Sequence, residues 1–397
     1  MPEFNKGRHI KNRLSGKPKL LSMAVIAIII FLFAILLFFL FIHDEPPEEP
    51  IPEEPILEAE VPPAPPLVLV WEYAPVAPDP TTIGPMNPVQ IVSPTWFQIT
   101  NKAGTIDNQV DKNYLNWARE RGYGIWPLVT NSFDPEITAA ILSRFWIRHK
   151  IVNDLIDLAL YYDFDGINID FENFHVDYRN LFSKFISELA GRCREENLVL
   201  SVDVTMISSS QFWSAGYDRE TLATEVDYLI LMAYDEHYSA SPTAGSVSSL
   251  PWVEKGLRRI LQEVPAEKLI LGVPFYTRLW KIDNSGDKPL VLDCRSYSMQ
   301  RASEIMEENE TEIYWDLEAK QHVASYSKDN LDYIMWLEDT ASMFYRLELV
   351  ERYNLAGIAG WRRGLEKDTI WHLVEDWLAE TYPSSGEGED SPSEGEQ

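Results

Sequence analysis

The stretch FDGINIDFENF, residues 164–174, has the composition of a β-strand and a strict two-residue alternation. One face is apolar, and the opposite face carries an amide and two carboxyls, the side chains of Asn168, Asp170 and Glu172. An uncompensated buried charge costs several kcal/mol, so an ordinary buried strand does not place two carboxyls on one face. The pattern indicates a catalytic acid with its partner, a metal site or a polar network inside a barrel, and the spacing alone leaves these three interpretations open.

Seven further strand-like runs lie between residues 67 and 382, and helical patterns separate most of them. This alternation predicts an α/β fold, a parallel (β/α)8 TIM barrel whose fourth strand carries the carboxyls. The Pro-rich first connection shows no helical pattern. The interval 281–339 is far longer than a usual βα loop and is expected to carry a small insertion between strands 7 and 8. The predicted strands are Leu67–Tyr73, Pro88–Thr100, Gly124–Asn131, Gly166–Glu172, Val199–Thr205, Asp227–Asp235, Leu269–Tyr276 and Leu355–Trp361, and the clearest helices are Ile151–Tyr162, Tyr178–Glu195, Trp252–Glu263, Ser342–Tyr353 and Lys367–Glu380.

The N-terminal part of the chain has the pattern of a membrane anchor. Residues 1–19 carry six Lys or Arg and one Glu, and residues 20–42 are uncharged and rich in Ile, Leu and Phe. At 1.5 Å per residue such a helix spans a hydrocarbon core about 30 Å thick. A cleaved signal peptide is the alternative, but the apolar run is long for one and no small-residue cleavage pattern follows it. We predict a single-pass anchor in the cell membrane with a cytoplasmic N-terminus and an extracytoplasmic body.

The rest of the sequence divides into a linker, a body and a tail. Residues 43–66 are rich in Pro and Glu and are predicted to form a semi-rigid spacer. Residues 67–382 form the predicted barrel, and the acidic tail, residues 383–397, is predicted to be disordered. The body carries −20 of the formal net charge of −28, which is a poor match for nucleic acid. With only Cys193 and Cys294 no disulfide framework is indicated, and idle thiols are favoured over a bridge.

Candidate site residues are expected at the carboxyl ends of the strands, where TIM barrels place their sites. Carboxyls, an arginine and aromatic rings meet there, and this mixture suits the hydroxyls and apolar faces of sugar rings. No Gly-rich phosphate loop follows a predicted strand. A metal site at Asp235 and His237 is not favoured, because two ligands are too few to hold a metal ion. The predicted substrate-binding side chains at these ends include Trp96, Asp235, Tyr276, Arg278 and Trp361; among Trp96, Trp126, Trp280 and Trp361, core packing competes with substrate contact, and Trp361 is the first candidate for contact.

The motif DGINIDFE, residues 165–172, resembles the DGxDxDxE signature of glycoside hydrolase family 18, the chitinase family. LMAYDEH at 231–237 and GIAGWRRG at 357–364 follow in the same order, so the resemblance covers essentially the whole body. Stretches such as SPTWF, GIWPLV and LGVPFYTRLW are similar to the bacterial branch that contains spore-cortex and cell-wall N-acetylglucosaminidases. Relatives in that branch usually carry LysM wall-binding repeats, and here the predicted anchor takes their place.

The resemblance implies retaining, substrate-assisted hydrolysis without a metal or cofactor. Glu172 would be the general acid and later the base, with a pKa raised by a water-poor cleft. The carbonyl oxygen of the sugar's own 2-acetamido group would be the nucleophile. Asp170 would hold the acetamido N–H, and Tyr234 would donate to the acetamido oxygen. Asp235 would help to hold the distorted sugar, and Trp361 would form the floor beneath it.

One position departs from the family's common pattern. Asn168 stands where many members have the first Asp of the motif. A carboxyl there would raise the pKa of Asp170 by like-charge repulsion and could take a proton from it, whereas an amide can only form hydrogen bonds. We therefore expect Asp170 to stay ionised and directed toward Glu172, and we expect Asn168 to contact substrate.

Three functions remain open on the sequence alone. The first is a membrane-anchored, extracytoplasmic glycosidase that cleaves β-1,4 bonds at N-acetylglucosamine in peptidoglycan. The second is a chitinase or chitooligosaccharide hydrolase, which would have a longer aromatic-lined groove. The third is a catalytically inactive glycan-binding lectin. The presence of Glu172 together with Asp170 and Tyr234 disfavours the third.

Overall fold

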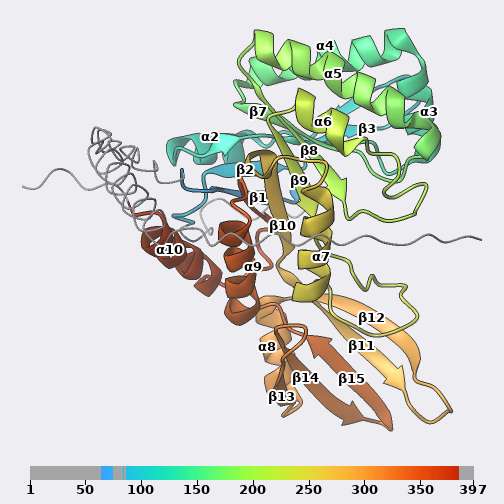
Figure 1. Cartoon of the computed structure of the whole chain (residues 1–397), viewed down its shortest axis with the longest axis vertical. Helices are drawn as coiled ribbons and strands as arrows, with labels where there is room; N and C mark the ends of the chain where they lie inside the picture. The colour runs from blue at the N-terminus through green and yellow to red at the C-terminus, as the bar shows by residue number, and fades with distance from the viewer. Residues whose placement is uncertain (1–63, 75–83, 85, 384–397) are drawn as a thin grey trace, which may run out of the picture. The chain divides into compact units, whose positions relative to one another are not determined.

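The carboxyl-bearing strand lies within a curled, mainly parallel sheet (Figure 1). The structure, a computed structural model, describes residues 64–74, 84 and 86–383. The strands of this sheet are β1 (Leu67–Glu72), β2 (Ile91–Pro94), β3 (Phe97–Ile99), β4 (Ile106–Asn108), β5 (Gly124–Ile125), β6 (Leu128–Thr130), β7 (Gly166–Asp170), β8 (Val199–Thr205), β9 (Tyr228–Met232), β10 (Leu269–Pro274) and β16 (Gly357–Trp361). Each of the eight predicted runs contains at least one of them.

The strand pairings are those of a TIM-barrel-like domain. The order is β4-β3-β6-β7-β8-β9-β10-β16-β1-β2-β5, and every pair except β3–β4 is parallel. β2 and β3 follow one another directly along the chain, as do β5 and β6. The pairing of β2 with β5 and of β3 with β6 therefore joins the two ends of the order. All the parallel strands direct their carboxyl ends to one edge, where a site is expected.

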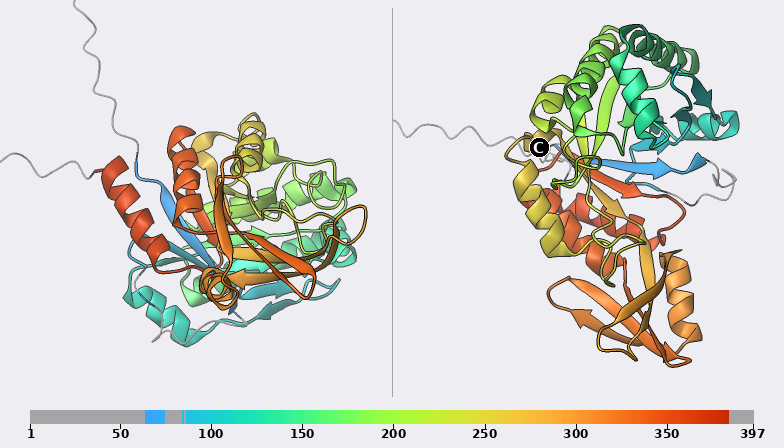
Figure 2. Two further views of the ribbon diagram at one scale, coloured as in Figure 1. Left: turned by 90° about the horizontal axis from the view of Figure 1, so that it is seen from below. Right: turned by 90° about the vertical axis from the view of Figure 1, so that its right-hand side faces the viewer.

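Helices cover the outer face of this sheet (Figures 1 and 2). In α5 the buried side chains Phe182, Phe185, Ile186 and Leu189 recur at the spacing of one helix face. The five helices predicted from the sequence are all present, and α2, α3 and α6 add to them. The bounds are α2 (Lys112–Glu120), α3 (Pro135–Ser143), α4 (Phe145–Tyr162), α5 (Arg179–Glu195), α6 (Arg219–Glu225), α7 (Leu250–Ile260), α9 (Thr340–Arg352) and α10 (Thr369–Thr381), with short 3-10 turns at Val176–Tyr178 and Ala266–Lys268.

The insertion between the seventh and eighth barrel strands is an antiparallel sheet with one helix. Its elements are β11 (Tyr276–Asp283), β12 (Leu290–Ser298), α8 (Met299–Glu308), β13 (Glu312–Asp316), β14 (Gln321–Lys328) and β15 (Leu331–Trp336), in the sheet order β12-β11-β15-β14-β13. It begins at Tyr276 rather than at residue 281, because β10 runs into β11 without a turn sequence to mark the boundary. Figure 2 shows this sheet beside the barrel sheet.

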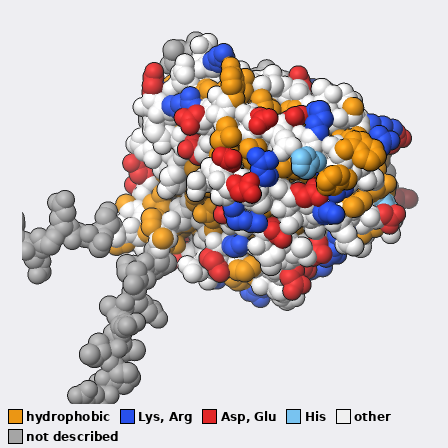
Figure 3. All heavy atoms as spheres, turned by 90° about the horizontal axis from the view of Figure 1, so that it is seen from above, with side chains coloured by type: hydrophobic (Ala, Val, Ile, Leu, Met, Phe, Trp, Pro, Cys, Tyr) orange, Lys and Arg blue, Asp and Glu red, His pale blue; other side chains and the backbone are white. Residues whose placement is uncertain are grey.

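The described residues show no membrane-spanning element. None of their helices is long and apolar enough to cross a bilayer. The predicted anchor, residues 20–42, lies outside the described part of the chain, as do residues 1–19, most of the linker and nearly all of the tail. Both cysteines are described and are free thiols, as predicted. On the face of the body shown in Figure 3, Lys and Arg side chains are interspersed with Asp and Glu, so neither sign of charge is concentrated on that face.

Candidate active site

The predicted polar face of β7 points into the barrel. Asn168 is fully buried and accepts hydrogen bonds from Trp71 Nε1 at 3.0 Å and from Ser93 Oγ at 3.1 Å, on β1 and β2. Asp170 is 5% exposed, and Glu172, in the loop just after β7, is partly exposed. The alternation expected from the sequence is therefore confirmed, and it leads from a buried amide to a carboxyl at the open end of the strand.

Two buried residues hold the backbone that carries Glu172. Asn131, which directly follows β6, accepts from the Glu172 N–H at 3.1 Å and donates to the Glu172 carbonyl at 2.6 Å. The hydroxyl of Tyr217 donates to the Phe171 carbonyl at 2.8 Å, and the Phe171 ring stacks on Phe185 of α5 with 5.4 Å between centroids. Sequence reasoning missed Asn131 and Tyr217, although Asn131 ends a predicted strand. These contacts fix the backbone from which the side chain of Glu172 extends.

Burial and like charges set the ionisation of the central groups. The pKa of Glu172 is raised well above its ordinary value, by burial first and then by the negative charges of Asp170 and Asp235. Burial and the neighbouring carboxylates, Asp203 first, also raise the pKa of Tyr234. Both shifts favour the protonated forms of Glu172 and Tyr234, which are the forms that can donate a hydrogen bond or a proton.

The structure bears on two expectations about the first positions of the motif. The pKa of Asp170 is raised well above its ordinary range, by burial and by the charge of Asp203 on β8, and both act against the ionised form that was expected. Asn168 forms four hydrogen bonds within the protein, the remaining two as donor to Ser201 Oγ at 3.0 Å and to Asp203 Oδ1 at 2.8 Å. It has no group left for substrate and instead positions its neighbours.

The insertion brings two predicted substrate-binding residues to Asp235. Arg278 of β11 donates to Asp235 Oδ1 at 2.6 Å, and the Tyr276 hydroxyl donates to the same oxygen. Arg278 also donates to Ser296 Oγ of β12 at 2.9 Å. The Tyr276 ring lies edge-on to Tyr234, with 6.4 Å between centroids. These contacts tie the first strands of the insertion to the end of β9.

A cavity of about 320 Å³ opens between these groups and the eighth barrel strand. Tyr276, Arg278 and Tyr297 line it from the insertion, and Trp361 and Arg362 line it from the end of β16. Its volume is in the range of small-ligand sites. The insertion therefore forms one wall of the cavity, and Trp361 supplies an aromatic surface on the barrel side.

The other predicted tryptophans belong to the core. Trp96 is 2% exposed and packs against Tyr114 at 5.9 Å and Phe164 at 5.7 Å, between the sheet and its helices. The structure therefore does not bring Trp96 into the site, because it faces the apolar layer outside the barrel. Trp126 and Trp280 are also buried. Of these four tryptophans, Trp361 alone lines the cavity.

Buried carboxyls with raised pKa values, a tyrosine and an aromatic-walled cavity at the carboxyl end of a TIM-barrel-like sheet are typical of a glycan-cleaving hydrolase. Residues 141–366 match the sequence model of the Glycosyl hydrolases family 18, and the chain belongs to this family. It is therefore a glycoside hydrolase.

Proteins similar to this chain include glycosylases and cortex-lytic enzymes of Bacillus species. YdhD of Bacillus subtilis carries the name of a sporulation-specific glycosylase. It is 26% identical over 297 residues, 74% of this chain and 65% of that protein. The cortical fragment-lytic enzyme of B. subtilis is 27% identical over 254 residues, 63% of this chain and 58% of that enzyme. The chain thus spans less than two thirds of the length of these relatives. The crystal structure of the Bacillus megaterium spore cortex-lytic enzyme SleL shares the fold, with a TM-score of 0.68 and 21% identity over 78% of this chain and 73% of that one.

Proposed function

We propose that this protein is a membrane-anchored, extracytoplasmic glycosidase that hydrolyses β-1,4 bonds next to N-acetylglucosamine in peptidoglycan, with retention of configuration. The observation that carries the proposal is the arrangement at the end of β7. Two hydrogen bonds with Asn131 hold the backbone of Glu172. Burial and the negative charges of Asp170 and Asp235 raise the pKa of its carboxyl. The names of the sporulation and cortex-lytic relatives support a cell-wall substrate.

The residues support a substrate-assisted reaction. Protonated Glu172 donates its proton to the glycosidic oxygen as the bond from that oxygen to the sugar C1 breaks. The acetamido carbonyl oxygen attacks C1, with its N–H held by Asp170 and its oxygen accepting from the Tyr234 hydroxyl. Ionised Glu172 then removes a proton from water, which opens the oxazolinium ion and regenerates the 2-acetamido group. Asp235, fixed by Tyr276 and Arg278, is placed to hold the sugar's hydroxyls.

The pKa of Glu172 predicts how activity depends on pH. The acid works only while protonated, so kcat/KM falls as pH rises through the raised pKa of Glu172. The charge of Asp235 contributes to that raised pKa, and Asp235→Asn removes it. In pH–rate profiles this variant is expected to lose its activity at lower pH than the wild-type enzyme does. If kcat/KM of Asp235→Asn falls at the same alkaline pH as that of the wild-type enzyme, a group other than Glu172 sets this fall or Asp235 does not influence it.

The position of Arg362 supports peptidoglycan rather than chitin as the substrate. Arg362 lines the cavity together with Trp361, and burial lowers the pKa of its guanidinium. It lies 5.0 Å from the ring centre of Tyr73, and none of the ion pairs among the described residues includes it. The charges of Glu72 and Glu366 act on Arg362, but neither forms an ion pair with it among the described residues. A partly buried cation without a paired carboxylate is costly, and an anion from the substrate would offset that cost. In peptidoglycan the sugar next to N-acetylglucosamine carries a lactyl carboxylate, whereas chitin is uncharged.

The substrate assignment is tested by Arg362→Gln on both polymers. This variant is expected to lose roughly tenfold in kcat/KM on peptidoglycan strands, the value of about one charge-assisted hydrogen bond, and to be unchanged on N-acetylglucosamine oligomers. Arg295→Gln is the matched control, because Arg295 is exposed and paired with Asp293 within β12. Products are identified by mass spectrometry. A wild-type preference for the neutral oligomers, or equal losses on both substrates, would favour a chitooligosaccharide hydrolase instead.

The membrane location is tested by fractionation. The basic residues 1–19 and the uncharged residues 20–42 support a retained anchor. The full chain is expected in the membrane fraction after an alkaline wash, and a chain that starts at residue 44 in the soluble fraction. A mature protein whose N-terminus begins near residue 43 would instead show that residues 20–42 are a cleaved signal peptide.

A further inference from the structure

A second buried carboxyl, Asp203, lies beside Asp170 on the neighbouring barrel strand. In the parallel pairing of β7 with β8, Asn168 is opposite Ser201 and Ile169 is opposite Val202, so the next position places Asp170 opposite Asp203. Both side chains lie on the inward face and are almost fully buried, at 5% and 1% exposure. The mechanism described above does not use Asp203.

The hydrogen bonds around Asn168 fix its orientation toward Asp203. Its oxygen accepts from Trp71 Nε1, and an indole N–H can only donate. The amide nitrogen of Asn168 must therefore face β8, where it donates to Ser201 and, at 2.8 Å, to Asp203 Oδ1. Asn168 has no proton to give up at ordinary pH. It cannot neutralise Asp203 and can only hold it in place.

The surroundings of both carboxyls contain acids and no paired cation. Glu172 and the phenols of Tyr217 and Tyr234 are the titratable groups that face them, and within the described chain no Lys, Arg or His forms an ion pair with Asp170 or Asp203. Asp170 Oδ1 is buried and has no hydrogen-bond partner among the described residues. Two carboxylates at adjacent positions in such a site cannot both be ionised cheaply, and this cost favours a state in which the pair holds one proton.

We propose that Asp203 is a positioning residue that holds this shared proton for Asp170. When substrate binds and Asp170 accepts the acetamido N–H, the proton moves from the Asp170 carboxyl to the Asp203 carboxylate. Asp170 becomes the anion beside the developing oxazolinium ion, and Asp203 becomes the neutral acid. The carboxyl that the family motif would supply at position 168 is thus supplied by β8. This step rests on the proposed catalytic roles of Asp170 and Glu172.

The proton can be observed without any measurement of activity. In the full chain carrying Glu172→Gln, infrared titration follows the C=O stretch of protonated buried carboxyls. When Asp203→Asn is added, Asp170 loses its like-charged neighbour, and its carboxyl signal is expected to disappear at lower pH. Adding Asn168→Asp to Asp203→Asn moves the second carboxyl to the other end of the 2.8 Å hydrogen bond and is expected to return the midpoint upward. A midpoint unchanged by Asp203→Asn overturns the proposal.

Kinetics give the second readout. With Glu172 intact, Asp203→Asn is expected to lower kcat roughly 10- to 100-fold with KM nearly unchanged, because Asp170 then lacks the partner that positions it and takes up its proton when substrate binds. The exchange variant Asn168→Asp/Asp203→Asn is expected to recover most of the loss. A purely structural role would lower the melting temperature without this recovery, and that result also overturns the proposal. If wild-type enzyme cleaves no N-acetylglucosamine glycan, the proposed function fails, but the infrared result still decides whether the proton is shared.

Discussion

Glu172→Gln is expected to lower kcat on N-acetylglucosamine glycans by roughly 10²- to 10⁴-fold, the usual contribution of a positioned general acid. The amide keeps the shape of the carboxyl and cannot deliver a proton to the glycosidic oxygen. The backbone contacts with Asn131 do not involve the side chain of Glu172, so the fold at the end of β7 is retained. Release of reducing ends measures the loss, and calorimetry is expected to show wild-type affinity for the glycan.

A matched control separates this loss from a general effect of Glu-to-Gln changes. Glu136 on α3 is exposed and forms an ion pair with Lys102 at the surface, so Glu136→Gln is expected to keep wild-type kcat. If Glu172→Gln is as active as this control, Glu172 is not the acid. If it no longer binds glycan, the loss reports a damaged site rather than missing chemistry.

The part of the molecule that follows strict periodicity was predictable. The alternation around Asp170 places its polar face in the barrel, and the run predicted at Val199–Thr205 is β8 itself. The boundary at Tyr276 was not predictable, because one strand continues into another without a turn. Trp96 was placed in the site because it stands near a strand end, but the break between β2 and β3 turns it toward the helices.

The residues missed at the site act through other residues. Asn131 and Tyr217 hold backbone atoms of the Glu172 segment, and such contacts leave no motif in a sequence. Asp203 shares one face of an alternating strand with Ser201 and Thr205, and this pattern could have marked it as facing the barrel interior. Its meaning depends on the register between β7 and β8, which only the structure supplies.

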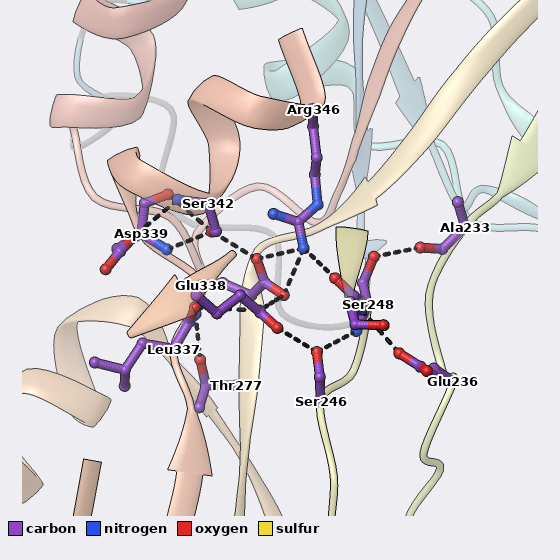
Figure 4. A network of polar contacts seen from close by, with 12 residues as sticks. Ala233, Glu236, Ser246, Ser248, Thr277, Leu337, Glu338, Asp339, Ser342 and Arg346 are labelled. Atoms are coloured by element: carbon purple, nitrogen blue, oxygen red, sulfur yellow. Dashed lines mark hydrogen bonds and ion pairs between the residues drawn. The ribbon is translucent and has the colours of Figure 1, made fainter. Parts of the chain in front are cut away.

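A buried ion pair joins the insertion to the barrel (Figure 4). Glu338, just after β15, and Arg346 of α9 are 0% and 2% exposed in their side chains and lie 2.9 Å apart. Arg346 also donates to the Ser248 carbonyl at 2.6 Å, and Ser248 Oγ donates to the Ala233 carbonyl at 2.7 Å, directly before Tyr234. The network thus connects the end of the insertion with the strand end that carries a proposed catalytic residue.

Arg346→Met is expected to reduce the free energy of unfolding by about 3–5 kcal/mol at alkaline pH, because it leaves the Glu338 carboxylate buried without its cation. Burial already raises the pKa of Glu338 to about 7, and Arg346 opposes that rise. Without the arginine the pKa rises further. The folded variant then binds a proton that the unfolded chain releases near pH 4.5, so its stability falls as pH rises, and the difference from wild type shrinks in acid.

Urea unfolding of the full chain across this pH range measures the effect, and two variants interpret it. Arg352→Met, on the same helix, removes a half-exposed arginine 3.5 Å from Glu254 and is expected to cost less than about 1 kcal/mol at any pH. Adding Glu338→Gln to Arg346→Met removes the unpaired charge and is expected to restore most of the stability and to abolish its pH dependence. If Arg346→Met is equally destabilised in acid and alkali, lost packing rather than the buried carboxylate accounts for the change, because a neutral Glu338 does not require the guanidinium.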